Sequence, residues 1–319
     1  MANVFESAAK EHPDVDFILM GGDLVHHQVW NTTVEDNLAH FDATASALYD
    51  SFPNVKIYPV VGNHEAHPCN MFPTQDLWHT EHNIAWMYER LADKFGKDLS
   101  PKSLEMFRKV GYYSELHAEN FRIVVLNTNF CYLNNFWLFY DPIDPEEHLK
   151  WLADTLQEAE DNNEVVWLFG HEPPGFDDCW MIWSNQFHRI VNRYEAIIKS
   201  QFYGHTHNDD FKIFFEDDKP TNALWVGASS TPHVGLNPGY KVFFADGVDG
   251  NNTWEIIDHE TWIYDLEAAN DNGEEIEPEW YKEYSFKEAF EMDSLRPGDL
   301  YDLVVRMLTD DDLFQKFYA

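Results

Sequence analysis

One arrangement constrains this 319-residue chain more than any other: an apolar run, then a turn that begins with glycine, then a side chain that can bind a metal ion. It occurs at Gly22-Asp23, Gly62-Asn63-His64-Glu65, Gly170-His171-Glu172 and Gly204-His205-Thr206-His207. Glycine lets the backbone turn sharply, so that the following side chain points out from the carboxyl edge of a sheet. Carboxylates, amide oxygens and imidazoles together suit Zn²⁺, Mn²⁺ or Fe. The repetition predicts a metal centre at one sheet edge.

Each segment alone also has an ordinary structural interpretation. A Gly-Asp pair after a strand is typical of a turn, and Pro173-Pro174 would make the third segment a rigid proline turn. The strongest single segment is the last one, because His205 and His207 alternate at a strand end. At this strand end we expect the two side chains to diverge, so that they could serve two different metals.

The order of apolar and helical patterns predicts an α/β sandwich with two sheets at its centre. Strands are expected in DFILMGGD, KIYPVVGNH, FRIVVLNTN, EVVWLFGHEPPG and SQFYGHTHND, and a second, largely antiparallel set in ALWVGASS, YKVFFADG and EIIDHETWIYDL. Helices are expected over residues 37–51, 85–95, 146–161, 185–199 and 300–308. We predict a catalytic domain over residues 1–270 and a helical region packed on it over residues 271–319.

The balance of acidic and basic side chains limits the classes of partner that this chain can bind. Acidic side chains number 57 against 21 basic ones, which gives a net charge of −36. So acidic a surface argues against nucleic acid as a partner. It also argues against docking on anionic lipid that relies on charge alone. An acidic compartment and a heavily solvated or halophilic surface explain the acidity equally well. The sequence contains no run of 18 apolar residues, so we expect no transmembrane helix. We also expect a monomer.

The segments quoted above resemble the motifs of the calcineurin-like metallophosphoesterases, which run Asp-x-His, Gly-Asp, Gly-Asn-His, Gly-His and Gly-His-x-His. Within that superfamily the chain is similar to the acid sphingomyelinases over nearly its whole length. The stretches that carry this similarity are GNHEAHPCNMFP, NTNFCYLNNFW, DPEEHLKWLADTLQEAED, GHEPPG, RIVNRYEAIIKSQFYGHTH and GLNPGY. The resemblance implies a two-metal phosphodiesterase with Zn²⁺ as cofactor. It also implies sphingomyelin as the substrate, cleaved to ceramide and phosphocholine.

The resemblance also assigns roles to residues. Asp23 would bridge two metals, Asn63, His171 and His205 would complete the shell of the second metal, and His207 would serve the first. His64 would be the general acid that protonates the departing ceramide alkoxide, and His27 would help to orient the phosphate. For His64 and His27 the alternative is a role in holding a ligand carboxylate. Glu65 is assigned to such a supporting role rather than to catalysis.

Further expectations follow from the same resemblance. Cys131 and Cys179 would form a disulfide, which requires an oxidising compartment, and Cys69 would have no partner. Trp137, Trp180 and Trp183 are either core residues or a seat for a choline headgroup. His233 and Tyr240 are candidates for substrate contact. Sequons at Asn31 and Asn251 are candidate glycosylation sites. The parent protein is expected to be secreted or lysosomal, although the first residues lack a signal-peptide pattern.

The chain departs from the family at its first motif, because no Asp-x-His triplet occurs in it. We therefore expect the first strand of the fold to be missing, with the family's flanking regions absent at both ends. The first metal would keep only Asp23 and His207, below the three protein ligands usual in catalytic zinc sites. Two alternatives stay open: a phosphodiesterase for nucleotides or other diesters, and an inactive metal-binding pseudoenzyme or fragment.

Overall fold

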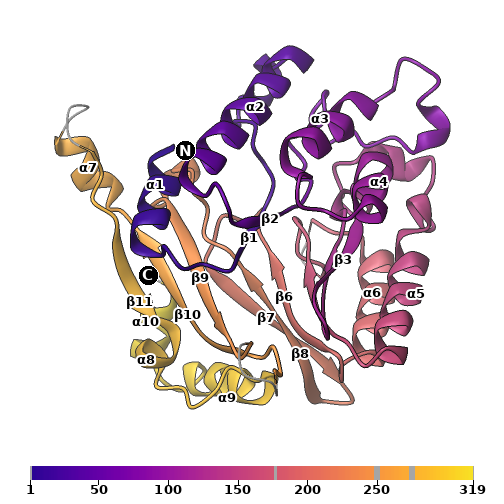
Figure 1. Cartoon of the computed structure of the whole chain (residues 1–319). Coiled ribbons are helices and arrows are strands. Elements are labelled where there is room, and N and C mark those ends of the chain that lie inside the picture. Colours follow the sequence, from indigo (N-terminus) through magenta and orange to yellow (C-terminus); the bar gives the residue numbers. More distant parts are fainter. Residues whose placement is uncertain (1, 176–177, 248–251, 273–276, 319) are drawn as a thin grey trace.

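The structure, a computed structural model, describes residues 2–175, 178–247, 252–272 and 277–318. Its centre is a six-stranded sheet with the order β3-β4-β5-β6-β8-β7 (Figure 1). The strands are β3 (Tyr113–Ala118), β4 (Phe121–Val125), β5 (Val165–Phe169), β6 (Ile198–Tyr203), β7 (Asp210–Glu216) and β8 (Lys219–Val226). From β4 to β8 neighbouring strands are parallel, and β3 and β7 add antiparallel edges. The carboxyl ends of the parallel strands therefore meet at one edge of the sheet.

The two faces of this sheet are buried against different partners. In β4 and β5, Ile123 and Phe169 face one core, whereas Val124 and Leu168 face the other, as the two-residue period of a strand requires. The second core is closed by α5 (His148–Asp161) and α6 (Met181–Arg193), which lie side by side in Figure 1. Both faces are covered, which is why these strands read as continuous apolar runs.

The first core is closed by a second layer of short sheets and helices. This layer holds the parallel pair β1 (Phe17–Met20) and β2 (Lys56–Pro59), and the antiparallel sheet of β9 (Gly239–Ala245), β10 (Ile256–Ile263) and β11 (Tyr281–Ser285). The helices of the first half are α1 (Ala2–Glu11), α2 (Val34–Ser51), α3 (Ala85–Phe95) and α4 (Pro101–Val110). Phe41 and Leu48 of α2 and Leu91 of α3 are buried in this core.

The last part of the chain is helical around β11. It contains α7 (Leu266–Asn272), α8 (Phe286–Phe290), α9 (Pro297–Met307) and α10 (Asp311–Tyr318). In the described part of the chain, six 3-10 turns connect larger elements: Val29–Asn31, Gln75–Leu77, Thr128–Phe130, Phe136–Phe139, Pro145–Glu147 and His233–Gly235. Because β11 pairs with β10, the sheet spans the domain boundary placed after residue 270, and that boundary stays a prediction.

The α/β sandwich flanked by helices is confirmed, with three corrections to its details. The ALWV of ALWVGASS, residues 223–226, ends β8 inside the six-stranded sheet, beside β6, and is not part of the second set. The helix expected over residues 185–199 runs instead from Met181 to Arg193, because Ile198 already belongs to β6. The second layer is divided into two separate sheets. Within the described residues, no helix has the length and apolar character needed to cross a bilayer.

Candidate metal centre

The predicted ligands come from loops that follow the carboxyl ends of strands in both layers. Asp23 follows β1, Asn63 follows β2, His171 follows β5 and His205 follows β6. The edge where these strands end is the place where open α/β sheets bind ligands. The four segments singled out in the sequence thus converge on one region.

Two glycines allow the first two loops to approach each other closely. A Cβ on Gly62 would lie 2.3 Å from Asp23 Oδ1, and a Cβ on Gly22 would lie 2.6 Å from the Gly62 backbone nitrogen. Gly22 also has a φ of +83°, a conformation that costs glycine nothing and other residues much. No larger residue fits either position without moving the loops.

Four donor side chains converge on one point. Ligand atoms of Asp23, His171 and His205 all lie within 4.8 Å of one another. His171 Nε2 lies 3.1 Å from Asp23 Oδ2 and 3.1 Å from Asn63 Oδ1. His205 Nδ1 lies 3.0 Å from the same Asn63 oxygen and 3.3 Å from His171 Nε2. This group is called the four-donor cluster below.

The outer nitrogens of both histidines are held by partners. His171 Nδ1 donates to the Gly21 carbonyl over 2.6 Å, and His205 Nε2 lies 3.3 Å from Asp178 Oδ2. A carbonyl or carboxylate on the far nitrogen fixes the tautomer and turns the near nitrogen towards a metal. The role of Asp178 escaped prediction, because nothing in its local sequence shows that it approaches His205.

Asn63 and the first loop are held in a similar way. The Asn63 amide nitrogen donates to Asn70 Oδ1 over 2.8 Å, which leaves its oxygen for the cluster. The buried carboxylate of Glu65 accepts backbone N–H groups from Asp23, Leu24 and Gly62, at 3.1, 2.5 and 2.6 Å. Glu65 thus holds both loops together, which fits the supporting role predicted for it. Asn70 was not predicted.

Burial and neighbouring charge act strongly on this cluster. Burial opposes the charging of His171, but the Asp23 carboxylate outweighs it and raises the pKa of His171 to about 10. Burial also opposes the ionisation of Asp23, yet His171 lowers the pKa of that carboxyl. Burial lowers the pKa of His205 to about 3, helped by the charge of His171. Burial raises the pKa of Glu65 to about 7.

A second group of side chains lies beside the cluster. The His27 ring stacks on His233 at 3.8 Å between ring centroids, and meets His64 and His207 edge-on at 4.6 and 4.9 Å. His64 Nδ1 lies 3.1 Å from the Val25 carbonyl oxygen, and its Nε2 lies 3.9 Å from Asp23 Oδ2. Burial, together with the other imidazoles, lowers the pKa of His27 to about 4. His207 therefore lies among imidazoles, outside the group of donor atoms around Asp23.

The four-donor cluster fits a divalent transition metal. It offers one carboxylate, one amide oxygen and two imidazole nitrogens, with the remaining ring nitrogens already engaged. Asp23, His205 and His207 have φ values of +55°, +68° and +65°. Left-handed backbone at non-glycine residues is uncommon and gathers at functional sites.

Other predicted residues are placed as follows. Cys131 and Cys179 form a disulfide, and Cys69 is a free thiol. Trp183 is a core residue that stacks on Phe187, whereas Trp180 and Trp137 are half-buried. Tyr240 contacts His12, Trp262 and Trp280 rather than the histidines of the site. Asn31 is exposed, and Asn251 lies outside the described residues.

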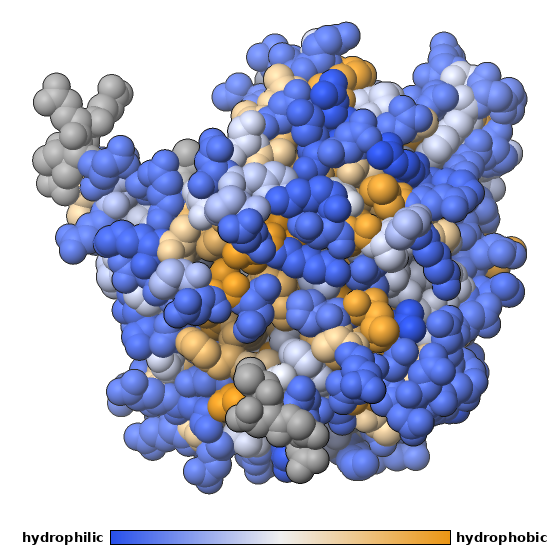
Figure 2. Space-filling model, viewed as in Figure 1, coloured by the Kyte–Doolittle hydropathy of each residue, from blue (hydrophilic) through white to orange (hydrophobic). Residues whose placement is uncertain are grey.

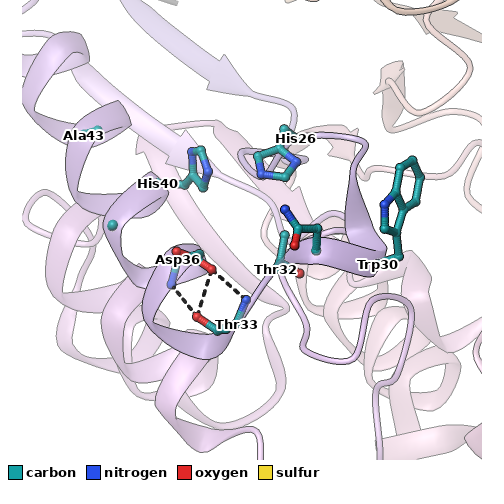
Figure 3. A pocket seen from close by; sticks show the side chains of 9 residues that line it. His26, Trp30, Thr32, Thr33, Asp36, His40 and Ala43 are labelled. Atoms are coloured by element: carbon teal, nitrogen blue, oxygen red, sulfur yellow. Dashed lines mark hydrogen bonds between the residues drawn. The ribbon is translucent and has the colours of Figure 1, made fainter.

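A pocket of about 710 Å³ opens between α2 and the loop after β1, where His26 precedes His27 (Figure 3). His26 and His40 meet edge-on in it at 5.1 Å, and Trp30 stands at its rim with 81% of its surface exposed. Thr33 and Asp36 form the capping box that begins α2. Within the described part of the chain, none of the predicted metal ligands lines this pocket.

Two family models match this chain. Residues 1–209 match the calcineurin-like phosphoesterase family, and residues 220–319 match the acid sphingomyelin phosphodiesterase C-terminal region. The chain belongs to the calcineurin-like phosphoesterases, a family whose members bind divalent metals. A dimetal phosphatase from Danio rerio shares the fold, with a TM-score of 0.54 and 15% identity over 82% of this chain and 85% of that one.

More specific relatives are sphingomyelin phosphodiesterases. The chain is 37% identical to that of Bos taurus and 36% identical to that of Homo sapiens, each over 95% of this chain and 48% of the relative. It is 30% identical to sphingomyelinase phosphodiesterase C of Dictyostelium discoideum, over 98% of this chain and 72% of the relative. The chain thus spans about half the length of the first two relatives.

Proposed function

We propose that this chain is a zinc-dependent phosphodiester hydrolase that cleaves sphingomyelin to ceramide and phosphocholine. The observation that carries the proposal is the four-donor cluster of Asp23, Asn63, His171 and His205, with an oriented histidine beside it. The relatives named as sphingomyelin phosphodiesterases supply the choice of substrate. A bound divalent ion supplies Lewis acidity to a phosphoryl oxygen and to an attacking water.

The protein's own residues divide the remaining tasks. With Nδ1 directed at the Val25 carbonyl, His64 presents Nε2 towards the cluster, where it would protonate the leaving alkoxide of ceramide. The flat stack of His27 on His233 fixes the ring plane of His27, which would position the phosphate oxygens by hydrogen bonding.

We propose one tightly held ion. The four-donor cluster supplies four ligands for one ion. His207 lies apart from it, beside His27 and His233, at ring distances of 4.9 and 5.8 Å. Metal analysis after dialysis should return about one equivalent of zinc. Two tightly bound ions would contradict this assignment.

The disulfide Cys131–Cys179 supports a protein that works outside the reducing cytosol. We therefore propose a secreted or lysosomal location, in keeping with the expected glycosylation at the exposed Asn31.

The test is turnover of a choline phosphodiester by the zinc-loaded chain, with a nucleotide diester as competitor. His205→Ala should abolish the cleavage, because it removes one of the four donors. The matched control is His188→Ala, a histidine on α6 whose ring contacts Phe214 and not the cluster. Retained turnover in His205→Ala would refute the site, and preference for the nucleotide would refute the substrate.

A further inference from the structure

Exposed apolar side chains gather in one place, next to the disulfide. Among the described residues, seventeen large hydrophobic side chains are exposed, and seven of them lie in two short segments of the chain, 133–143 and 181–182. We call these seven the apolar rim: Leu133, Phe136, Phe139, Tyr140, Ile143, Met181 and Ile182. Phe139, Ile143 and Ile182 are exposed by 71, 84 and 68%. A gathering of this kind marks an interaction surface more often than chance.

The two segments form one surface, because several bonds hold them side by side. Cys131 and Cys179 are joined by the disulfide, Leu133 N donates to Asp178 O over 2.7 Å, and Trp180 N donates to Cys131 O over 2.8 Å. At the surface, the ring of Phe139 lies 5.6 Å from that of Trp180. Met181 and Ile182 follow Trp180 directly at the start of α6.

The apolar rim borders the candidate metal centre. Tyr132, which precedes Leu133, meets the His205 ring edge-on at 5.0 Å. Asp178, which precedes Cys179, lies 3.3 Å from His205 Nε2. A molecule docked on the rim therefore lies beside the four-donor cluster.

The charged residues in the segments that carry the apolar rim indicate which kind of surface it can bind. Residues 131–149 and 178–188 contain no lysine or arginine, whereas they contain five carboxylates: Asp141, Asp144, Glu146, Glu147 and Asp178. These carboxylates repel anionic lipid and nucleic acid. A choline lipid surface presents quaternary ammonium groups outermost, which carboxylates and aromatic faces such as those of Phe139 and Tyr140 attract. Below the choline groups lies an acyl region that accepts apolar side chains.

We propose that the apolar rim docks this chain on a zwitterionic surface of choline lipids, so that a headgroup reaches the metal centre without leaving the bilayer. The choice of a lipid over a protein partner rests on the proposed function. The docking itself requires no turnover, so it can be tested separately.

The test is flotation of the zinc-loaded chain with phosphatidylcholine vesicles that contain no sphingomyelin. The wild-type chain should float with them, and vesicles rich in phosphatidylserine should bind it less. The variant Phe139→Ser/Met181→Ser/Ile182→Ser should lose about tenfold or more of the binding, because each side chain buries its apolar surface in the bilayer. The matched control is Val305→Ser/Leu308→Ser, which removes exposed apolar side chains at the end of α9.

Three results would overturn the proposal: no wild-type binding to phosphatidylcholine, equal losses in both variants, or self-association through the rim with no vesicle binding. If the triple variant fails to fold by circular dichroism, Ile143→Ser replaces it, since that side chain is 84% exposed. His205→Ala should bind vesicles as the wild type does. Loss of turnover with retained binding would thus separate a failure of the proposed function from a failure of docking.

Discussion

Asp209 forms an ion pair with Lys241, whose side chain is only 3% exposed. The second carboxylate oxygen of Asp209 accepts hydrogen bonds from the hydroxyls of Thr261 and Tyr284, each over 2.5 Å. Asp209 lies two residues after His207, whereas its three partners lie on β9, β10 and β11. One carboxylate therefore links the loop that carries His205 and His207 to all three strands of the sheet formed by β9, β10 and β11.

Lys241→Met should destabilise the chain by about 3–5 kcal/mol, because it leaves the Asp209 carboxylate without its buried cation. The measurement is urea unfolding followed by tryptophan fluorescence. The control is Lys282→Met, which removes a cation that is 43% exposed and lies 3.0 Å from Glu260 in the same sheet. That change should cost less than about 1 kcal/mol, and equal losses would contradict the anchoring role of Asp209.

Glu65→Gln should weaken zinc binding about tenfold to hundredfold, the usual effect of losing a group that orients metal ligands. In the wild type, three backbone N–H groups donate to the Glu65 carboxylate. A glutamine keeps the shape of the side chain, but its NH₂ group cannot accept these hydrogen bonds. Competition with a fluorescent chelator measures the affinity. Glu164→Gln is the control, since Glu164 is also buried but pairs with Arg122, 2.6 Å away, at the start of β4 and β5. Unchanged affinity in Glu65→Gln would remove Glu65 from the site.

His148 should make the fold sensitive to acid. It is fully buried, stacks on Tyr112 at 4.6 Å, and burial lowers its pKa from 6.5 to about 3. Between these values the unfolded chain binds a proton that the folded chain does not, so stability falls as the pH drops below about 6.5. At about 1.4 kcal/mol per pH unit, this residue alone removes about 2 kcal/mol at pH 5.

The check on this prediction is the variant His148→Phe, which keeps an aromatic ring at the stack. Its free energy of unfolding should fall about 2 kcal/mol less between pH 7 and pH 5 than that of the wild type. His82→Phe, a change at an exposed histidine, serves as the comparison. An equal fall in the wild type and His148→Phe would show that this histidine is not the source of acid sensitivity.

The disulfide gives a prediction that needs no activity. In the unreduced and unfolded chain, a thiol reagent should label Cys69 alone, and reduction should add Cys131 and Cys179. The bond closes a 48-residue separation, so Cys131→Ala/Cys179→Ala should lower the unfolding free energy by about 4 kcal/mol on the chain-entropy model. Cys69→Ala is the matched control. Labelling of all three cysteines before reduction would refute the pairing.

The sequence was informative wherever one local pattern determined the outcome. The strands that carry the ligand segments were recognisable because each is an apolar run that stops at a turn, whereas β3, β7 and β11 were not predicted. The helix over residues 85–95 was predicted to the residue. The ligand segments could be found because glycine and metal-binding side chains are adjacent in the chain. The convergence of Asp23, Asn63, His171 and His205 follows from their shared place after strand ends.

The supporting residues could not be found in this way. Asn70, Asp178 and Asp209 act on groups that only folding brings near them. The wrong assignment of ALWVGASS has the same origin: β8 joins β6 through long-range parallel pairing, which the composition of the run cannot reveal.

The fixed orientation of the ligand imidazoles has a practical consequence. Because Gly21, Asp178 and Asn70 already hold the outer atoms of His171, His205 and Asn63, an incoming ion meets donor atoms that are already oriented. Metal exchange then becomes a matter of solution chemistry rather than of refolding. We expect that one preparation, stripped with a chelator, can be reloaded with zinc, manganese or iron in turn without unfolding the chain.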